Sequence, residues 1–239
     1  MSIKKLLAEI RKFYTDNADE EIVKKYAKFF VEGYDPYGVD PKLMIPQREL
    51  WLNKYKDELG FEGFLKLGDI LLKSGKYEEA FAAFFFAKSF ADQFRPKTLE
   101  KFGKWLESDI KNWAHTDSLC GDVLPQFILK NIVSLDAFSD WRKSDSKWKR
   151  RAVPVTMIKL LKTEMSVKSL LDFIDPLMLD EEKVVHQGLG WFLREAWKIY
   201  PKSVEAFLLK WKDKCARLII QYATEKMSAK EKLRFRKSK

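Results

Sequence analysis

Apolar residues recur along this chain at spacings of three and four, the period at which side chains return to one face of an α-helix. We expect helices wherever this period persists, with turns at the breaks between them. Alternation of apolar and polar positions is not convincing anywhere, and Asn-Gly and Asp-Gly pairs are absent, so strands and hairpins are not expected. The predicted helices cover residues 3–14, 22–31, 41–55, 61–73, 77–90, 96–109, 144–161, 167–174, 180–199, 201–210 and 215–225, with shorter pieces over 116–130 and 134–142.

Helices of similar length joined by short connections predict an all-α fold. Their pairing favours an α-α superhelix, a solenoid of degenerate HEAT-like repeats. The repeat shows in the length of the elements rather than in residue identity, with a period of roughly 35–45 residues. An irregular helical bundle is the alternative. The 239 residues suit a single helical-repeat domain, 1–239, that ends in a basic C-terminal tail at 230–239.

Trp191 falls away from the apolar stripe of its predicted helix. The stripe over 183–199 consists of Val185, Leu189, Phe192, Ala196 and Ile199. At about 100° per residue, Trp191 lies instead on the polar side, with Lys183, Gln187, Arg194 and Lys198. An exposed tryptophan among cations is costly to solvate, so it favours a binding surface for a polyanion with flat apolar groups, such as DNA.

Trp148 repeats this pattern in the helix predicted over 144–161. We expect it to face outward, because the buried side is marked by Val153, Met157, Leu160 and Leu161, and the outer side by Ser144, Arg151, Lys159 and Lys162. Pro154 lies inside this helix and should kink it or shorten it near 149–150.

The composition narrows the classes of partner and cofactor. Lysine and arginine total 45 against 35 acidic residues, which gives a net charge of +10 and favours phosphate backbones or an acidic surface. The two cysteines and two histidines form no metal-binding spacing, so we expect neither a metal nor a cofactor. The N-terminus lacks the apolar run of a signal peptide, and no stretch approaches the ~18 apolar residues of a membrane span. We therefore expect a soluble, cytoplasmic protein without membrane contact, associated with the nucleoid in a prokaryote.

Three segments, in order along the chain, resemble the AlkD-type DNA alkylation-repair glycosylases. They are Asn-Trp-Ala-His-Thr-Asp-Ser at 112–118, Ser-Lys-Trp-Lys-Arg-Arg-Ala-Val at 146–153 and Gly-Leu-Gly-Trp-Phe-Leu-Arg-Glu at 188–195. Weaker similarity at 25–29, 37–39 and 216–226 extends the match to most of the chain. The resemblance implies a HEAT-like monomer that binds double-stranded DNA containing alkylated bases and cleaves the N-glycosidic bond of N3- and N7-alkylated purines.

The resemblance also implies residue roles. Asp117 corresponds to the catalytic carboxylate, and Trp113 and Trp191 to the rings that face the lesion. The implied DNA contacts are Trp148, Arg151, Arg194 and, more loosely, Tyr26, with Lys198 beside them. Two positions depart from the family pattern, because Ala114 stands where an acidic residue is common and Thr116 where an apolar one is common.

These residue types suit the expected chemistry. A cationic alkylpurine leaves without a proton, so the enzyme has mainly to stabilise the oxocarbenium-like sugar, which a carboxylate does electrostatically. Tryptophan rings add cation–π attraction on the order of 1–2 kcal/mol each. The resemblance further implies that the lesion stays stacked in the duplex, whereas many base-processing enzymes rotate it into a deep pocket.

Structural explanations compete with each of these assignments. Trp113 could be a core aromatic, Trp148 and Trp191 chance exposed rings, Asp117 a helix cap or a solvated residue, and Arg151 and Arg194 solvated charges. We expect His115 and His186 to be polar surface residues or to support the site, and Phe84–Phe86 to be core. The tail reads as a frayed helix end, with auxiliary phosphate contact as the alternative. At the level of function, a non-catalytic binder of damaged or branched DNA and a helical-repeat protein scaffold remain open.

Overall fold

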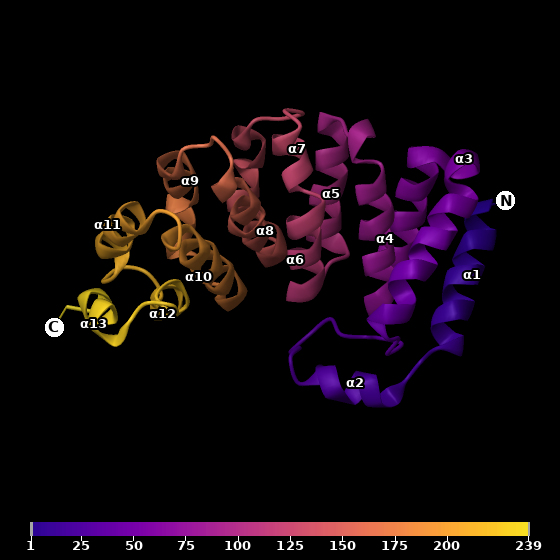
Figure 1. Ribbon diagram of the computed structural model, residues 1–239, viewed down its shortest axis with the longest axis horizontal. Helices are drawn as coiled ribbons and strands as arrows, with labels where there is room; N and C mark the ends of the chain where they lie inside the picture. The colour runs from indigo at the N-terminus through magenta and orange to yellow at the C-terminus, as the bar shows by residue number, and fades with distance from the viewer. Residues whose placement is uncertain (1, 239) are drawn as a thin grey trace. The chain divides into compact units, whose positions relative to one another are not determined.

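The computed structural model describes residues 2–238; its regular elements are all helices, with no strand among those residues (Figure 1). An isolated bridge joins Asp35 to Lys76. Contacts between Cα atoms divide the chain into two compact units, unit 1 up to Gln126 and unit 2 from Phe127, and the helix α7 (Pro125–Leu129) crosses the boundary. None of the described helices is long and apolar enough to cross a membrane.

Unit 1 contains six longer helices. They are α1 (Ser2–Asp16), α2 (Glu20–Ala27), α3 (Pro41–Lys73), α4 (Tyr77–Ser89), α5 (Pro96–Ser108) and α6 (Trp113–Asp122). Helix α3 packs on α1 and α4, and α4 packs on α6. Gly60 interrupts α3 with a φ of 55° and a ψ of −174°, so the break predicted between 55 and 61 is confirmed. Helix α2 ends at Ala27, short of the predicted Val31. The residues that follow, which we call the 28–40 segment, are not helical.

Unit 2 is arranged around α10. Its helices are α8 (Lys147–Met157), α9 (Val167–Ile174), α10 (Lys183–Trp197), α11 (Pro201–Trp211), α12 (Arg217–Ala223) and α13 (Ala229–Lys232), joined in part by 3₁₀ turns. Helix α10 packs on α8, α11 and α12. Two glycines permit the close approach, because a Cβ on Gly188 would lie 3.2 Å from the side chain of Arg151 and one on Gly190 would lie 2.3 Å from the Cβ of Tyr222.

The predicted apolar stripe of α10 is confirmed except at its end. Val185, Leu189, Phe192 and Ala196 are fully buried, whereas Ile199 is 42% exposed. The helix ends at Trp197, so the helical period no longer places Ile199 on the same face. The C-terminal tail also differs from a frayed end, because α13 continues into a 3₁₀ turn at Leu233–Phe235 and the Phe235 side chain is fully buried.

Pro154 leaves α8 intact. The helix runs through it to Met157 and continues as a 3₁₀ turn at Ile158–Lys162, so the shortening predicted near 149–150 is not seen. A proline removes one backbone donor but has a φ compatible with the helix, and burial of the whole stretch from Arg151 to Met157 holds the conformation.

Candidate functional site

Helix α6 starts on a buried asparagine. The Asn112 side-chain oxygen accepts the backbone N–H of His115 at 2.9 Å, and its amide nitrogen donates to the carbonyl of Gly33 at 2.6 Å. This cap fixes where the helix begins and ties it to the 28–40 segment. Asp117 lies in the second turn of α6 and is therefore not its cap, which removes that structural alternative.

Trp113 is the first residue of α6 and is held with one side open. Its side chain is 40% exposed, so it is not a core aromatic. The indole nitrogen donates to the carbonyl of Phe29 at 3.1 Å, and the ring stacks on Phe30 with centroids 5.3 Å apart and planes 13° apart. The hydrogen bond and the stack fix the ring orientation before any ligand arrives. Asp117, half-buried, follows four residues later on the same face of the helix.

The two positions that depart from the family pattern are buried beside these residues. Ala114 is 8% exposed and Thr116 is fully buried. The Thr116 hydroxyl donates to the carbonyl of Asn112 at 3.0 Å, so it satisfies its own polar group within α6. Threonine can therefore replace an apolar residue here without leaving an unpaired donor.

An apolar cleft of about 460 Å³ opens beside Trp113 and also contains Tyr26. Two of the predicted site residues thus line one hollow of unit 1. We call it the aromatic cleft; its walls come from α2, the 28–40 segment and the starts of α3, α4 and α6. It is lined by Ile22, Tyr26, Phe29, Phe30, Tyr34, Val39, Pro41, Met44, Tyr77, Glu78 and Trp113.

The rings of the aromatic cleft support one another. Phe30 lies between Trp113 and Tyr34, with the Phe30 and Tyr34 centroids 4.3 Å apart and their planes nearly parallel at 4°. Tyr77 meets both Phe30 and Tyr34 edge-on, and burial raises the pKa of its hydroxyl to about 12. Aromatic contacts of this kind contribute about 0.5–1.5 kcal/mol each beyond the area they bury.

His115 lies behind Tyr77 and is not a surface residue. It is 4% exposed and stacks on Tyr77 with centroids 5.1 Å apart. Its Nε2 is 3.0 Å from the carbonyl of Tyr77 and its Nδ1 is 3.1 Å from the amide nitrogen of Asn112. A carbonyl only accepts, so these contacts match a neutral ring protonated at Nε2. Burial lowers the pKa of His115 to about 4, although the bond to the Tyr77 carbonyl opposes this.

Glu78 fixes the far end of the 28–40 segment. Its carboxylate accepts the backbone N–H groups of Tyr37, Gly38 and Val39 at 2.9, 2.8 and 3.2 Å. Gly38 has a φ of +86°, and a Cβ there would lie 2.2 Å from the carbonyl of Asp19, so this turn requires glycine. Residues 37–39, which weakly resemble the family, are thus the residues whose backbone N–H groups are bound by a buried carboxylate.

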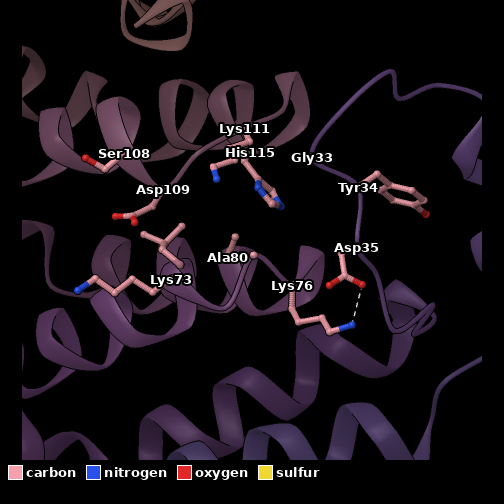
Figure 2. A pocket seen from close by; sticks show the side chains of 12 residues that line it. Gly33, Tyr34, Asp35, Lys73, Lys76, Ala80, Ser108, Asp109, Lys111 and His115 are labelled. Atoms are coloured by element: carbon pink, nitrogen blue, oxygen red, sulfur yellow. Dashed lines mark hydrogen bonds and ion pairs between the residues drawn. The ribbon is translucent and has the colours of Figure 1, made fainter.

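Tyr34 also lines a second, polar hollow of about 390 Å³. Figure 2 shows Lys73, Lys76 and Lys111 around it, with Asp35 and Asp109 between them. Lys76 is paired with Asp35 at 2.7 Å. Desolvation raises the pKa of Asp109 despite the nearby lysines. Charged side chains of both signs therefore line this hollow.

In unit 2 the predicted exposure of Trp148 is wrong. Trp148 is 6% exposed and Arg151 is 5% exposed, so neither stands on an outer polar face of α8. Arg151 donates to the carbonyl of Val184 at 2.5 Å, which ties α8 to the start of α10. Lys147 lies over the Trp148 ring, 5.4 Å from its centroid. Helix α8 is covered on more than one side, so a single apolar stripe does not mark its buried surface.

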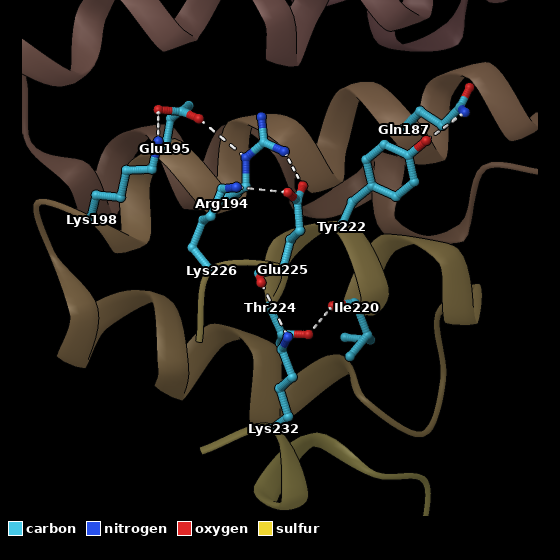
Figure 3. Close-up of polar contacts among 10 residues, drawn as sticks. All are labelled: Gln187, Arg194, Glu195, Lys198, Ile220, Tyr222, Thr224, Glu225, Lys226 and Lys232. Atoms are coloured by element: carbon cyan, nitrogen blue, oxygen red, sulfur yellow. Dashed lines mark hydrogen bonds and ion pairs between the residues drawn. The ribbon is translucent and has the colours of Figure 1, made fainter. Parts of the chain in front are cut away.

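The site residues predicted on α10 are less buried than those predicted on α8. Trp191 is half-buried, and Figure 3 shows Arg194 between Glu195 and Glu225. Arg194 pairs with Glu195 at 3.2 Å and with Glu225, and Lys198 pairs with Glu195 at 2.6 Å. Both predicted phosphate-binding cations of this helix are therefore engaged by carboxylates. His186, expected either at the surface or in support of the site, is 8% exposed and is therefore not a surface residue.

Sequence reasoning missed most of the aromatic cleft. Phe29, Phe30, Tyr34, Tyr77 and Glu78 were not among the predicted site residues, although each lines the hollow beside Trp113. The available signal was the density of aromatic residues from Tyr26 to Tyr37, a stretch that contains Gly33 and is followed by Gly38. The apolar spacing of the preceding helix continues into this stretch, so the pattern alone predicts a helix that extends to Val31.

Comparison with known proteins gives the family. The model of the family described as DNA alkylation repair enzyme matches residues 10–227. A solved structure described as a predicted DNA alkylation repair enzyme from Enterococcus faecalis is similar with a TM-score of 0.74 and 15% identity, covering 89% of this chain and 98% of that one. This similarity confirms the expected all-α superhelical fold class. No curated protein matches the sequence. The family match spans most of the chain, and the protein therefore belongs to the DNA alkylation repair enzyme family.

Proposed function

We propose that this protein is a monofunctional DNA glycosylase that hydrolyses the N-glycosidic bond of cationic N3- and N7-alkylated purines in double-stranded DNA. Membership of the DNA alkylation repair enzyme family supports a DNA-repair enzyme. The observation that carries the finer proposal is the pairing of Trp113 and Asp117 on one face of α6. The indole is open and oriented in advance, and the carboxylate follows one turn later.

The proposed reaction needs no general acid. The C1′–N bond breaks heterolytically, and its electron pair neutralises the positive charge of the departing base. The sugar becomes an oxocarbenium-like cation, which the carboxylate of Asp117 stabilises. Water then adds to C1′ and its released proton passes to the carboxylate or to solvent, leaving an abasic site. A buried, neutral His115 is not available as an acid at neutral pH, which agrees with a preference for cationic lesions.

The net charge of +10 supports a phosphate-binding role. Arg194 on α10 and Lys198 just beyond the end of that helix are the proposed phosphate contacts, and Tyr26, 40% exposed, is a further proposed DNA contact. Trp148 and Arg151 are buried, so we do not place them at the phosphate backbone. Arg194 and Lys198 reach phosphate by exchanging their present carboxylates, Glu195 and Glu225, for it. Such an exchange makes affinity salt-dependent, with a slope of about −0.9 per neutralised phosphate.

Single-turnover release of 7-methylguanine from methylated duplex DNA tests the proposal. Asp117→Asn keeps the shape of the side chain but removes its charge, and should slow excision by roughly 10²–10³-fold. Asp122→Asn is the matched control, because Asp122 is on the same helix, 53% exposed, and pairs with Lys88 at the surface. The control should excise at the parent rate. Uracil and hypoxanthine, which are neutral, should be released at background rate.

Two results would count against the proposal. If Asp117→Asn excises as fast as the parent while both fold normally, Asp117 is not the catalytic carboxylate. If the parent binds methylated duplex but releases no base, the protein is a non-catalytic binder of damaged DNA.

A further inference from the structure

We propose that Asn112 and Gly33 are positioning residues that hold the Trp113 ring in place for base excision. The link to excision rests on the proposed function, whereas the support of the ring rests on the contacts of unit 1 alone. Both residues act through the 28–40 segment, because the ring is stacked against that segment. The open face of Trp113 then remains free for a base that stays stacked in the duplex.

Two supports of the Trp113 ring come from the 28–40 segment rather than from its own helix. The indole nitrogen donates to the carbonyl of Phe29, and the ring stacks on Phe30. Phe29 is itself 55% exposed, and both supports lie in backbone that is not helical. The orientation of the ring therefore depends on how firmly this segment is attached to the start of α6.

Asn112 makes that attachment from a buried position. It is 1% exposed; its side-chain oxygen accepts the backbone N–H of His115, and its nitrogen donates to the carbonyl of Gly33. The same nitrogen lies 3.1 Å from Nδ1 of His115. An amide nitrogen has two hydrogens, and these two contacts use both of them. A side chain that only accepts could cap the helix, but it could not hold Gly33.

Gly33 permits the close approach on which this hydrogen bond depends. Its φ is +65°, and a Cβ there would lie 2.4 Å from the carbonyl oxygen of Lys111. The backbone would have to move to accommodate a side chain, so another residue would push the segment away from Asn112. Beyond Gly33 the segment is attached to α4 through Asp35 and Glu78. The movement would therefore fall mainly on the residues before Gly33, which include both supports of the ring.

Gly33→Ala and Gly60→Ala form a matched pair for single-turnover release of 7-methylguanine at saturating enzyme. Gly60 has a φ of +55°, so alanine meets a similar backbone strain there, but no heavy atom lies within 4 Å of its Cβ. Trp113→Ala should slow excision by roughly 5- to 30-fold, the effect of losing one cation–π contact. Gly33→Ala should slow it by a smaller factor, at least about threefold, with duplex affinity within about twofold of the parent's. Gly60→Ala should excise at the parent rate.

A double-mutant cycle separates positioning of the ring from general damage to the fold. If Gly33 acts through the ring, Gly33→Ala should cause no further loss of rate in a Trp113→Ala background. Asn112→Ser provides a second route, because serine still caps α6 but is too short to hold Gly33. It should show the same loss and the same dependence on Trp113, so the test does not require Gly33→Ala to fold.

The indole N–H of Trp113 gives a readout that needs neither DNA nor activity. In protein with isotopically labelled tryptophan, its nuclear magnetic resonance signal is identified by its loss in Trp113→Phe. The hydrogen bond to Phe29 should slow its exchange with water in the parent and in Gly60→Ala. Exchange should be severalfold faster in Gly33→Ala and in Asn112→Ser.

Unchanged indole exchange in both Gly33→Ala and Asn112→Ser, or an equal loss of excision with and without the Trp113 ring, would overturn the inference. If the parent excises and neither variant alters the rate, the positioning role fails and the proposed function stands. If the parent releases no base while indole exchange responds as expected, the support of the ring stands and the proposed function fails.

Discussion

The buried His115 makes a specific prediction about acid stability. The pKa of its imidazole falls from an ordinary value of 6.5 to about 4 because burial disfavours the charged ring. The unfolded chain therefore binds more protons than the folded protein between those two values. Stability contributed by the neutral ring is complete above pH 6.5 and is lost as the pH falls toward 4. A shift of about 2.5 units at about 1.4 kcal/mol each gives a total of roughly 3–4 kcal/mol.

His115→Gln isolates this contribution. Glutamine can donate to the carbonyl of Tyr77 and accept from the amide of Asn112, and it does not titrate. We expect the parent to lose stability relative to the variant by roughly 1 kcal/mol between about pH 7.5 and 5.5, and by roughly 2–3 kcal/mol at about pH 4.5. Subtracting the two curves removes the contribution of the carboxylates, which both proteins share.

Urea denaturation of both proteins, followed by tryptophan fluorescence and by circular dichroism across this pH range, measures the difference. A difference in unfolding free energy that stays constant with pH would show that the imidazole is not buried in its neutral form. The contact of His115 with Tyr77 and Asn112 also links the loss to the site, because both residues border the Trp113 end of α6.

Three further outcomes follow from the packing and charge of the described residues. Glu225→Gln releases one carboxylate from Arg194 and should tighten duplex binding severalfold at low salt, as measured by fluorescence anisotropy; an unchanged affinity would show that Arg194 does not reach phosphate. Gly190→Ala forces a methyl group to 2.3 Å from the Cβ of Tyr222 and should lower the unfolding free energy by about 1–3 kcal/mol in urea. Gly121→Ala, with no heavy atom within 4 Å of the new methyl, should instead raise it by about 0.5–1 kcal/mol, and equal effects of the two alanines would refute the packing argument.

The helices could be predicted because their apolar period is strong and their ends carry local signals. Pro41, Pro96 and Pro201 each lie at the start of a helix, where a missing N–H costs nothing. The predicted end of α2 was wrong because the apolar spacing continues past the helix for a reason other than helical packing. Phe29 and Phe30 continue the apolar spacing of α2, but the helix ends at Ala27, and these two side chains line the aromatic cleft from the segment that follows.

Only those parts of the candidate site whose residues share one helix could be predicted from the sequence. Trp113 and Asp117 share α6, so their spacing alone places them on one face. Trp148 was misplaced because the period identifies a buried side only when the other side meets water, and α8 is covered on more than one side. Tyr26, Tyr77 and Glu78 come together through tertiary packing between distant segments, which the local sequence pattern does not report.

The single carboxylate of Glu78 has a consequence for hydrogen exchange. Three consecutive amides, those of Tyr37, Gly38 and Val39, share this one acceptor group, so breaking that contact exposes all three together. Helix α2, on the other side of the 28–40 segment, buries none of its side chains. Its amides should exchange quickly through local fraying, while the three amides bound to Glu78 should exchange slowly and with one common protection factor. The wall of the aromatic cleft formed by α2 should therefore open more readily than the part of the cleft held at Glu78.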